Sequence, residues 1–114
     1  MDYDKLIEEY KKLPQICEQI DYSDKKSVRA NKKAVKRMYE IVGLISISDS
    51  ARLEFIKLLD IKDYKIDLWS ATHIIEKLNP DITIKQKALS IIEEVAKGED
   101  SLAFGYQMWL KENV

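Results

Sequence analysis

Apolar residues recur at steps of three and four along most of the chain, which is the spacing of a helix that buries one side. A first stripe begins at Tyr3 and a second runs from Val28 to Ile45, where a helix over about 25–46 is predicted. Similar stripes predict a short helix over about 50–59, another up to Leu78, and two more before and after Gly98. With three glycines and two prolines in 114 residues, helices joined by short loops are favoured over a sheet. The sequence therefore predicts an all-α fold of about six helices in one domain, 1–114, with a helical pair over 1–46 and hairpins over 50–114.

Several residues predict where these helices start, end or bend. Pro14 lies inside the first stripe, where a missing backbone donor and ring crowding cost about 3 kcal/mol, so a kink or a break is expected. Asp63 is predicted to cap the fourth helix, and Thr83 with Gln86 has the spacing of a capping box for the fifth. Gly105 lies inside the last helix, which predicts that another backbone passes close to it.

The stretch from Leu58 to Pro80, LLDIKDYKIDLWSATHIIEKLNP, carries apolar groups on two sides of one predicted helix. Leu68, Ala71, Ile75 and Leu78 form one stripe, while Trp69 and His73, four residues apart, form a second one beside it. Two apolar sides require two layers of neighbours. This is typical of a helix inside a stacked array of helical hairpins, where each unit also packs on the next.

The same residues resemble HEAT-type repeats, and the resemblance extends over nearly the whole chain. The segment IDLWSATHII is similar to the repeat helix of a small bacterial family of HEAT-like proteins of unknown function. The segment from Asn31 to Tyr39 and the ending FGYQMWLKEN, with Gly105 and Trp109, also resemble that family. Asp67 departs from the pattern, because the repeat favours arginine there.

This resemblance implies a short right-handed array of helical hairpins, an α-α superhelix, and no assigned catalytic site. Some small helical-repeat proteins of bacteria are encoded beside secreted toxins and look like their antidotes. By analogy, the resemblance implies a protein-binding role, of which an immunity protein that blocks a cognate toxin is one specific form.

Charge and cysteine content narrow the setting. Nineteen basic and twenty acidic residues leave a net charge of −1, so no overall field attracts nucleic acid or membrane. The only cysteine, Cys17, cannot form an internal disulfide, and the acidic start MDYDKLIEEY lacks the pattern of a secretory signal. We therefore expect a soluble, cytoplasmic protein without membrane contact.

The strongest charge feature is the run KKSVRANKKAVKR, which contains seven basic residues and no acid. On a helix these side chains form two adjacent rows opposite the apolar face. The rows could contact an acidic protein or a nucleic-acid backbone, or they could be solvated or paired with the acidic residues of the first segment. The candidate contact residues in this run are Lys25, Arg29, Lys32, Lys33, Lys36 and Arg37.

Signals for catalysis are absent from the sequence. His73 is the only histidine, and with Glu76 three residues later it lacks the further ligands that zinc sites need, so a packed, hydrogen-bonded histidine is expected. Nucleophile elbows, phosphate-binding glycine loops and paired cysteines are also missing, so no cofactor, metal or catalytic residue is predicted. We expect a non-catalytic module that binds another protein, with Asp63, Asp67 and Glu76 as a second candidate contact edge. Nucleic-acid binding through residues 25–37 is the alternative, and an enzyme is the least expected.

Overall fold

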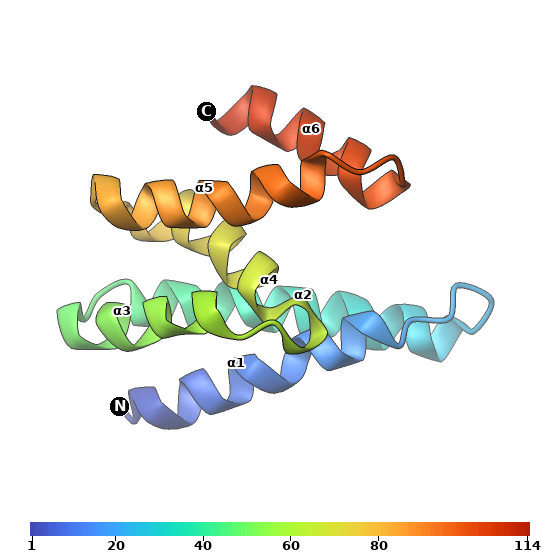
Figure 1. The fold of residues 1–114 in the computed structure, drawn as a ribbon. Helices are drawn as coiled ribbons and strands as arrows, with labels where there is room; N and C mark the ends of the chain where they lie inside the picture. Colours follow the sequence, from blue (N-terminus) through green and yellow to red (C-terminus); the bar gives the residue numbers. More distant parts are fainter.

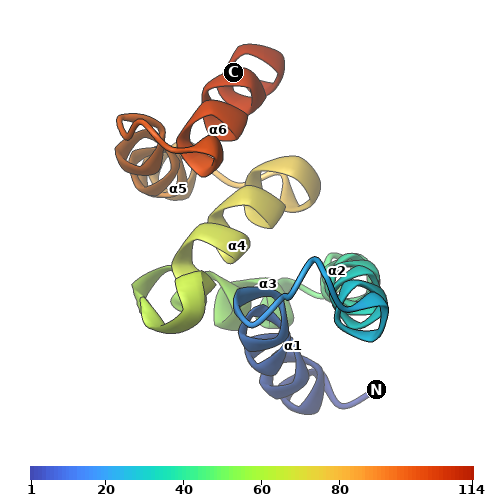
Figure 2. The same ribbon diagram turned by 90° about the vertical axis from the view of Figure 1, so that its right-hand side faces the viewer.

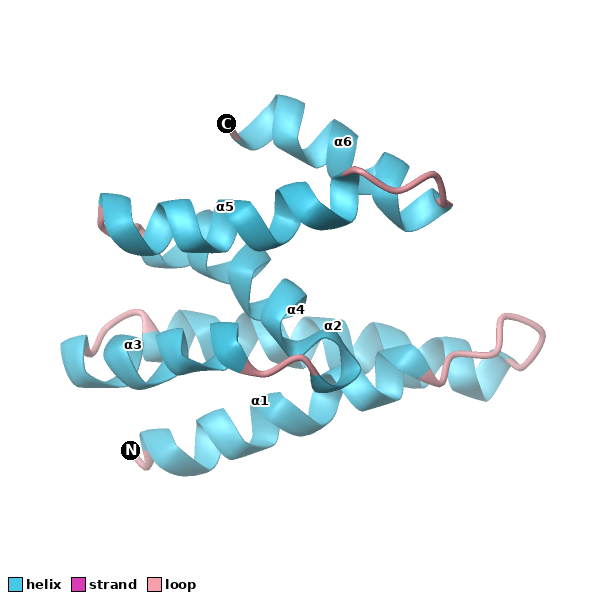
Figure 3. Ribbon diagram, in the orientation of Figure 1, coloured by secondary structure: helices cyan, strands magenta, loops and turns pink.

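Residues 1–114 form six α-helices and no strand in the computed structural model, which describes the whole chain (Figures 1 and 3). This confirms the prediction of an all-α fold with about six helices. A 3₁₀ turn, Lys57–Asp60, extends α3; another, Asp63–Lys65, precedes α4; and α4 continues as one π-helical turn, Ile74–Leu78. The α-helices are α1 (Tyr3–Glu18), α2 (Lys25–Ile45), α3 (Asp49–Ile56), α4 (Ile66–His73), α5 (Ile82–Ala96) and α6 (Ser101–Asn113).

Side-chain caps fix where most of the helices begin. At α2, α5 and α6, the carboxylates of Asp24, Asp81 and Asp100 each accept a hydrogen bond from a backbone N–H in the first turn. This satisfies one of the four donors that a helix start leaves free. The predicted capping box at the start of α5 is therefore wrong, because Asp81 takes the capping position and Thr83 already lies inside the helix.

The helices are arranged in two layers that α4 joins. Figure 2 shows α1, α2 and α3 side by side in the lower layer, α5 and α6 in the upper layer, and α4 running diagonally between them. The molecule measures 41 × 32 × 23 Å along its principal axes. None of its helices combines the length and the apolar content needed to cross a membrane.

The core lies around α4, which is buried on several sides. Ala71 and Ile74 are fully buried, and His73, on another side of the helix, is 1% exposed. Trp69 is partly buried and packs against the same core. The expectation that this helix has neighbours on two sides is confirmed, while the finer HEAT-like arrangement stays a prediction.

The start and end of α4 depend on backbone conformations that few residues adopt. Tyr64 and Lys65 have φ values of 51° and 59°, and Asn79 after the π-helical turn has a φ of 46°. This left-handed region is strained for most side chains but common for asparagine at helix ends. The prediction that Asp63 caps this helix is wrong, because the left-handed Lys65 precedes its first turn and no side chain caps it.

Two other expectations concern residues inside helices. Helix α1 continues through Pro14 to Glu18, so the proline does not end it, and its ring is buried. Gly105 is exposed, and nothing lies within 4 Å of the position that a Cβ would take. The prediction of a close backbone neighbour at Gly105 is therefore wrong.

Candidate functional site

The basic residues of α2 project from the side opposite its buried face. Met38, Val42 and Ile45 are buried against the core, as the apolar stripe predicts, while Val28 and Val35 of that stripe are partly buried. Ala34 and Ile41 are buried on the same side. At 100° per residue, the basic positions centre about 170° away from this group. We call the six exposed cations of this side the α2 basic face: Lys25, Lys26, Arg29, Lys32, Lys33 and Lys36.

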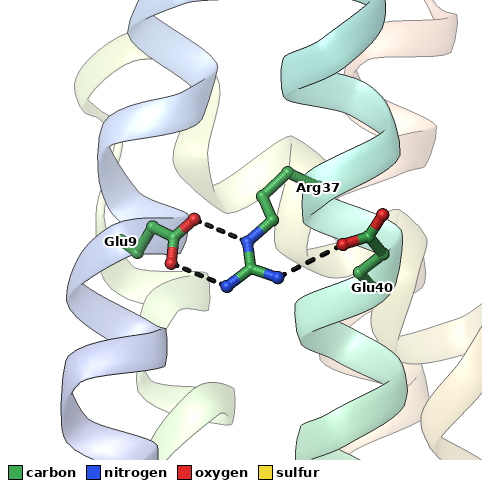
Figure 4. Close-up of polar contacts among 3 residues, drawn as sticks. All are labelled: Glu9, Arg37 and Glu40. Atoms are coloured by element: carbon green, nitrogen blue, oxygen red, sulfur yellow. Dashed lines mark hydrogen bonds and ion pairs between the residues drawn. The ribbon is translucent and has the colours of Figure 1, made fainter.

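Arg37 lies at the edge of this face and differs from it. Its guanidinium donates from Nε and Nη2 to the two carboxylate oxygens of Glu9 on α1, at 2.6 and 2.9 Å (Figure 4). A third hydrogen bond runs to Glu40, at 3.2 Å. The bidentate contact lowers the pKa of Glu9 and raises that of Arg37. Arg37 therefore joins α1 to α2 and is occupied within the molecule.

The six cations of the α2 basic face have no carboxylate within 4.0 Å, because none of the ion pairs in the structure includes them. Two further acidic residues of α1 are engaged elsewhere: Glu8 pairs with Lys11, and Glu18 pairs with Lys65. Pairing between the first two helices, one of the alternatives for this charge, is thus limited to Arg37. The rest of the face is exposed to solvent.

The structure does not bring the three acidic candidates together. Asp63 is exposed in the turn before α4, whereas the side chain of Asp67 is only 15% exposed and accepts from the N–H of Leu68 at 2.8 Å. Nine residues, or two and a half helical turns, separate Asp67 from Glu76, which places the two carboxylates on opposite sides. Asp67 faces α5, and Glu76 faces α2 and α6.

His73 is buried at the centre of an aromatic cluster. Its Nδ1 lies 2.6 Å from the hydroxyl of Tyr10, and its ring centroid lies 4.6 Å from that of Tyr39 and 5.9 Å from that of Trp69. Burial, with a smaller effect from the charge of Lys77, lowers the pKa of His73 to about 4. The expected packed, hydrogen-bonded histidine is confirmed, and its imidazole is neutral at pH 7.

A cleft of about 300 Å³ between α2, α4 and α6 is the feature that the sequence did not indicate. Tyr39 comes from α2, Glu76 follows α4, and Tyr106 and Trp109 come from α6. In the sequence, each of these residues fits either an apolar helical stripe or an exposed charged edge. No single segment therefore indicates the cleft. Only the packing of three distant helices places a carboxylate among aromatic rings.

A larger hollow of about 410 Å³ lies between α3 and α5, lined in part by Leu53, Ile56 and Ile84. Of its three charged residues, Asp49 and Arg52 pair with each other, and Asp81 caps α5. No group of three or more His, Cys, Asp or Glu side chains is close enough together to hold a metal ion. This hollow thus presents apolar surface without a free reactive group.

Comparisons of the chain with models of protein families, with curated proteins and with solved structures find no match. The resemblance to HEAT-like proteins stays a prediction.

Proposed function

We propose that this protein is a non-catalytic binding module that contacts an acidic surface of another protein through the α2 basic face. The observation that carries the proposal is that these six exposed cations lie on one side of one helix, each without a carboxylate within 4.0 Å. Like charges concentrated on a rigid helix repel each other, and an acidic partner removes that repulsion. Such complementarity raises the association rate and selects the partner.

The charge balance of the whole chain favours a protein partner. The net charge is −1, so the rest of the chain carries more acidic than basic residues and offsets the positive charge of this face. Aromatic side chains, on which single-stranded nucleic acids stack, are missing between the basic positions from Lys25 to Arg37. A protein with a local acidic patch fits this arrangement best.

We further propose that the hairpins form a HEAT-like array and that the module acts as an immunity protein that blocks a cognate toxin. The two-sided burial of α4 supports the array, because a stacked helix needs neighbours on both flanks. The immunity role rests on the resemblance of IDLWSATHII to the HEAT-like family.

The decisive experiment is affinity capture with matched charge variants. The tagged protein is compared with Lys25→Glu/Arg29→Glu/Lys32→Glu/Lys36→Glu and with the control Lys5→Glu/Lys12→Glu/Lys85→Glu/Lys111→Glu. Both variants change the net charge equally, and the control lysines are exposed or partly exposed without an ion pair. We expect one dominant polypeptide, after nuclease treatment, with the wild type and the control but not with the α2 variant. Equal recovery with all three proteins would contradict the proposal.

Nucleic-acid binding is the second candidate, because the α2 basic face extends over about 16 Å from Lys25 to Lys36 at 1.5 Å per residue. This reading predicts retention on a DNA or RNA column that falls steeply between low and physiological salt. No retention at low salt would exclude it. If the α2 variant is no longer retained on the column while the control variant still is, nucleic-acid binding would be favoured over a protein partner.

A further inference from the structure

The cleft between α2, α4 and α6 has a carboxylate at its centre. One oxygen of Glu76 accepts from the hydroxyl of Tyr39 at 3.1 Å, and the other accepts from Nε1 of Trp109 at 3.4 Å. No lysine or arginine nitrogen lies within 4.0 Å of Glu76, although its side chain is partly buried. The negative charge is thus held by neutral donors only.

The side-chain hydrogen-bond donors of Tyr39, Thr72, Tyr106 and Trp109 in the cleft are used inside the protein. Thr72 donates to the carbonyl of Leu68 at 2.9 Å, so the contact of 2.9 Å between Thr72 and Tyr106 uses the hydroxyl proton of Tyr106. Tyr39 and Trp109 donate to Glu76. What these groups still offer is acceptor capacity, namely the remaining lone pairs of the Glu76 carboxylate and of the two phenol oxygens. A ligand that hydrogen-bonds to these side chains must therefore bring donors.

The aromatic side chains that line the cleft favour the binding of a positively charged group. Tyr39, Tyr106 and Trp109 line the cleft, and the ammonium of Lys77 already lies 5.8 Å from the ring centroid of Tyr39. The faces of such rings attract cations. Burial and the nearby charge of Glu76 raise the pKa of Tyr39 to about 12, which is in line with a local negative potential.

Gly105 provides an independent observation. It lines the cleft, its φ is not positive, and no heavy atom lies within 4 Å of the place where its Cβ would be. A glycine inside a helix costs about 1 kcal/mol relative to alanine. Neither packing nor backbone conformation requires glycine here, but a side chain at this position would narrow the cleft.

We propose that this cleft binds a guanidinium group. A guanidinium is planar, brings five donors, stacks on aromatic rings and pairs with a carboxylate, which matches the acceptors and walls described above. A divalent metal ion does not fit, since Glu76 is the only carboxylate in the cleft. The guanidinium comes either from a free small molecule or from an arginine of a partner protein. This proposal does not depend on the α2 basic face.

The test is a titration followed by NMR of the ¹⁵N-labelled indole groups. N-acetyl-arginine amide is the probe, and N-acetyl-citrulline amide, which is neutral and of similar shape, is its control. We expect a Kd of roughly 1 mM for the arginine probe, given one carboxylate and aromatic walls in an open cleft. The Trp109 resonance should move, whereas the resonance of Trp69, which lies outside this cleft, should not. Equal shifts with both probes would overturn the proposal, as would no shift at about 20 mM.

Two variants separate binding from folding. Glu76→Gln keeps the size of the side chain and should weaken binding of the arginine probe by about tenfold or more. The matched control Glu93→Gln makes the same charge change at an exposed residue of α5 and should bind normally. Gly105→Leu should abolish binding while the helix retains its stability, since leucine is a better helix former. Unchanged affinity in both Glu76→Gln and Gly105→Leu would overturn the proposal.

Two further probes identify the source of the guanidinium. Agmatine represents free guanidines, and a capped Ala-Ala-Arg-Ala-Ala peptide represents an arginine in a protein chain. Tighter binding of agmatine supports a small-molecule ligand, and tighter binding of the peptide supports an arginine of a partner. Failure of both to shift the Trp109 resonance refutes the site.

Discussion

His73 should make the stability of the protein depend on pH well above the range in which carboxylates titrate. Its imidazole is 1% exposed, and its pKa is lowered to about 4 in the folded protein, chiefly by burial. An unfolded histidine has a pKa of about 6.5. The unfolded chain therefore binds one more proton than the folded chain between these two values. The contribution of the neutral imidazole to stability is therefore fully present above about pH 6.5 and is lost as the pH falls toward 4.

The size of this effect follows from the difference between the two pKa values. Each pH unit within the window changes the free energy of unfolding by about 1.4 kcal/mol. From pH 7.5 to pH 5, the loss should be about 2 kcal/mol, and at still lower pH it should approach about 3 kcal/mol. Protonation also makes both ring nitrogens donors, so the Tyr10 hydroxyl, 2.6 Å from Nδ1, can then only accept in this contact.

Urea unfolding at several pH values from about 7.5 to 5, followed by circular dichroism, measures this slope through the shift of the midpoint. Because His73 is the only histidine, the variant His73→Gln should lose most of the slope in this range. Glu9 and Asp21, whose pKa values are lowered, act in the same direction but in a more acidic window, since their stabilisation is lost only as the pH falls below the ordinary pKa of a carboxyl group. A wild-type midpoint that stays constant from pH 7.5 to 5, or a slope retained in His73→Gln, would refute this reasoning.

Three other substitutions test the packing and the helix ends. Phe55→Ala should destabilise the protein by about 3–5 kcal/mol in urea unfolding, because Phe55 is fully buried with its ring 4.8 Å from that of Tyr10; a loss below about 1 kcal/mol would contradict the described core. Gly43→Ala should raise the free energy of unfolding by about 0.5–1 kcal/mol, since Gly43 is exposed inside α2 and nothing lies within 4 Å of an added Cβ; a lower melting temperature would argue against this. Asp81→Ala should lower the free energy of unfolding by about 1 kcal/mol, because it removes the 2.9 Å capping hydrogen bond from the N–H of Ile84. An unchanged melting temperature would contradict a stabilising role of this cap.

The repeat of apolar residues was enough to predict the helices and the buried side of α2, because a helical period determines which residues share a face. It was not enough to predict the start of α4, where Tyr64 and Lys65 adopt left-handed conformations that their residue types rarely indicate. At α5, Asp81 rather than Thr83 caps the helix, because two nearby residues can both cap and only the path of the chain decides between them.

The cleft shows a different limit of sequence analysis. Tyr39 and Glu76 are 37 residues apart, and Glu76 and Trp109 are 33 apart, so no local pattern relates them. Glu76 was predicted as part of an exposed edge with Asp67, but nine residues at 100° each place the two on opposite sides of the helix, which the spacing in the sequence already implies. His73 is buried in the core, which confirms the prediction of a packed histidine.

The diagonal course of α4 between the two layers means that its apolar side chains complete one hydrophobic core that both layers share. A chain cut in the turn near Lys62 would separate α1–α3 from α4–α6 and would leave the apolar sides that meet between α1–α3 and α4 uncovered. Amide hydrogen exchange should therefore reveal a single global opening event for the slowest protons of α2, α4 and α5, and split-protein fragments should regain structure only when they are mixed.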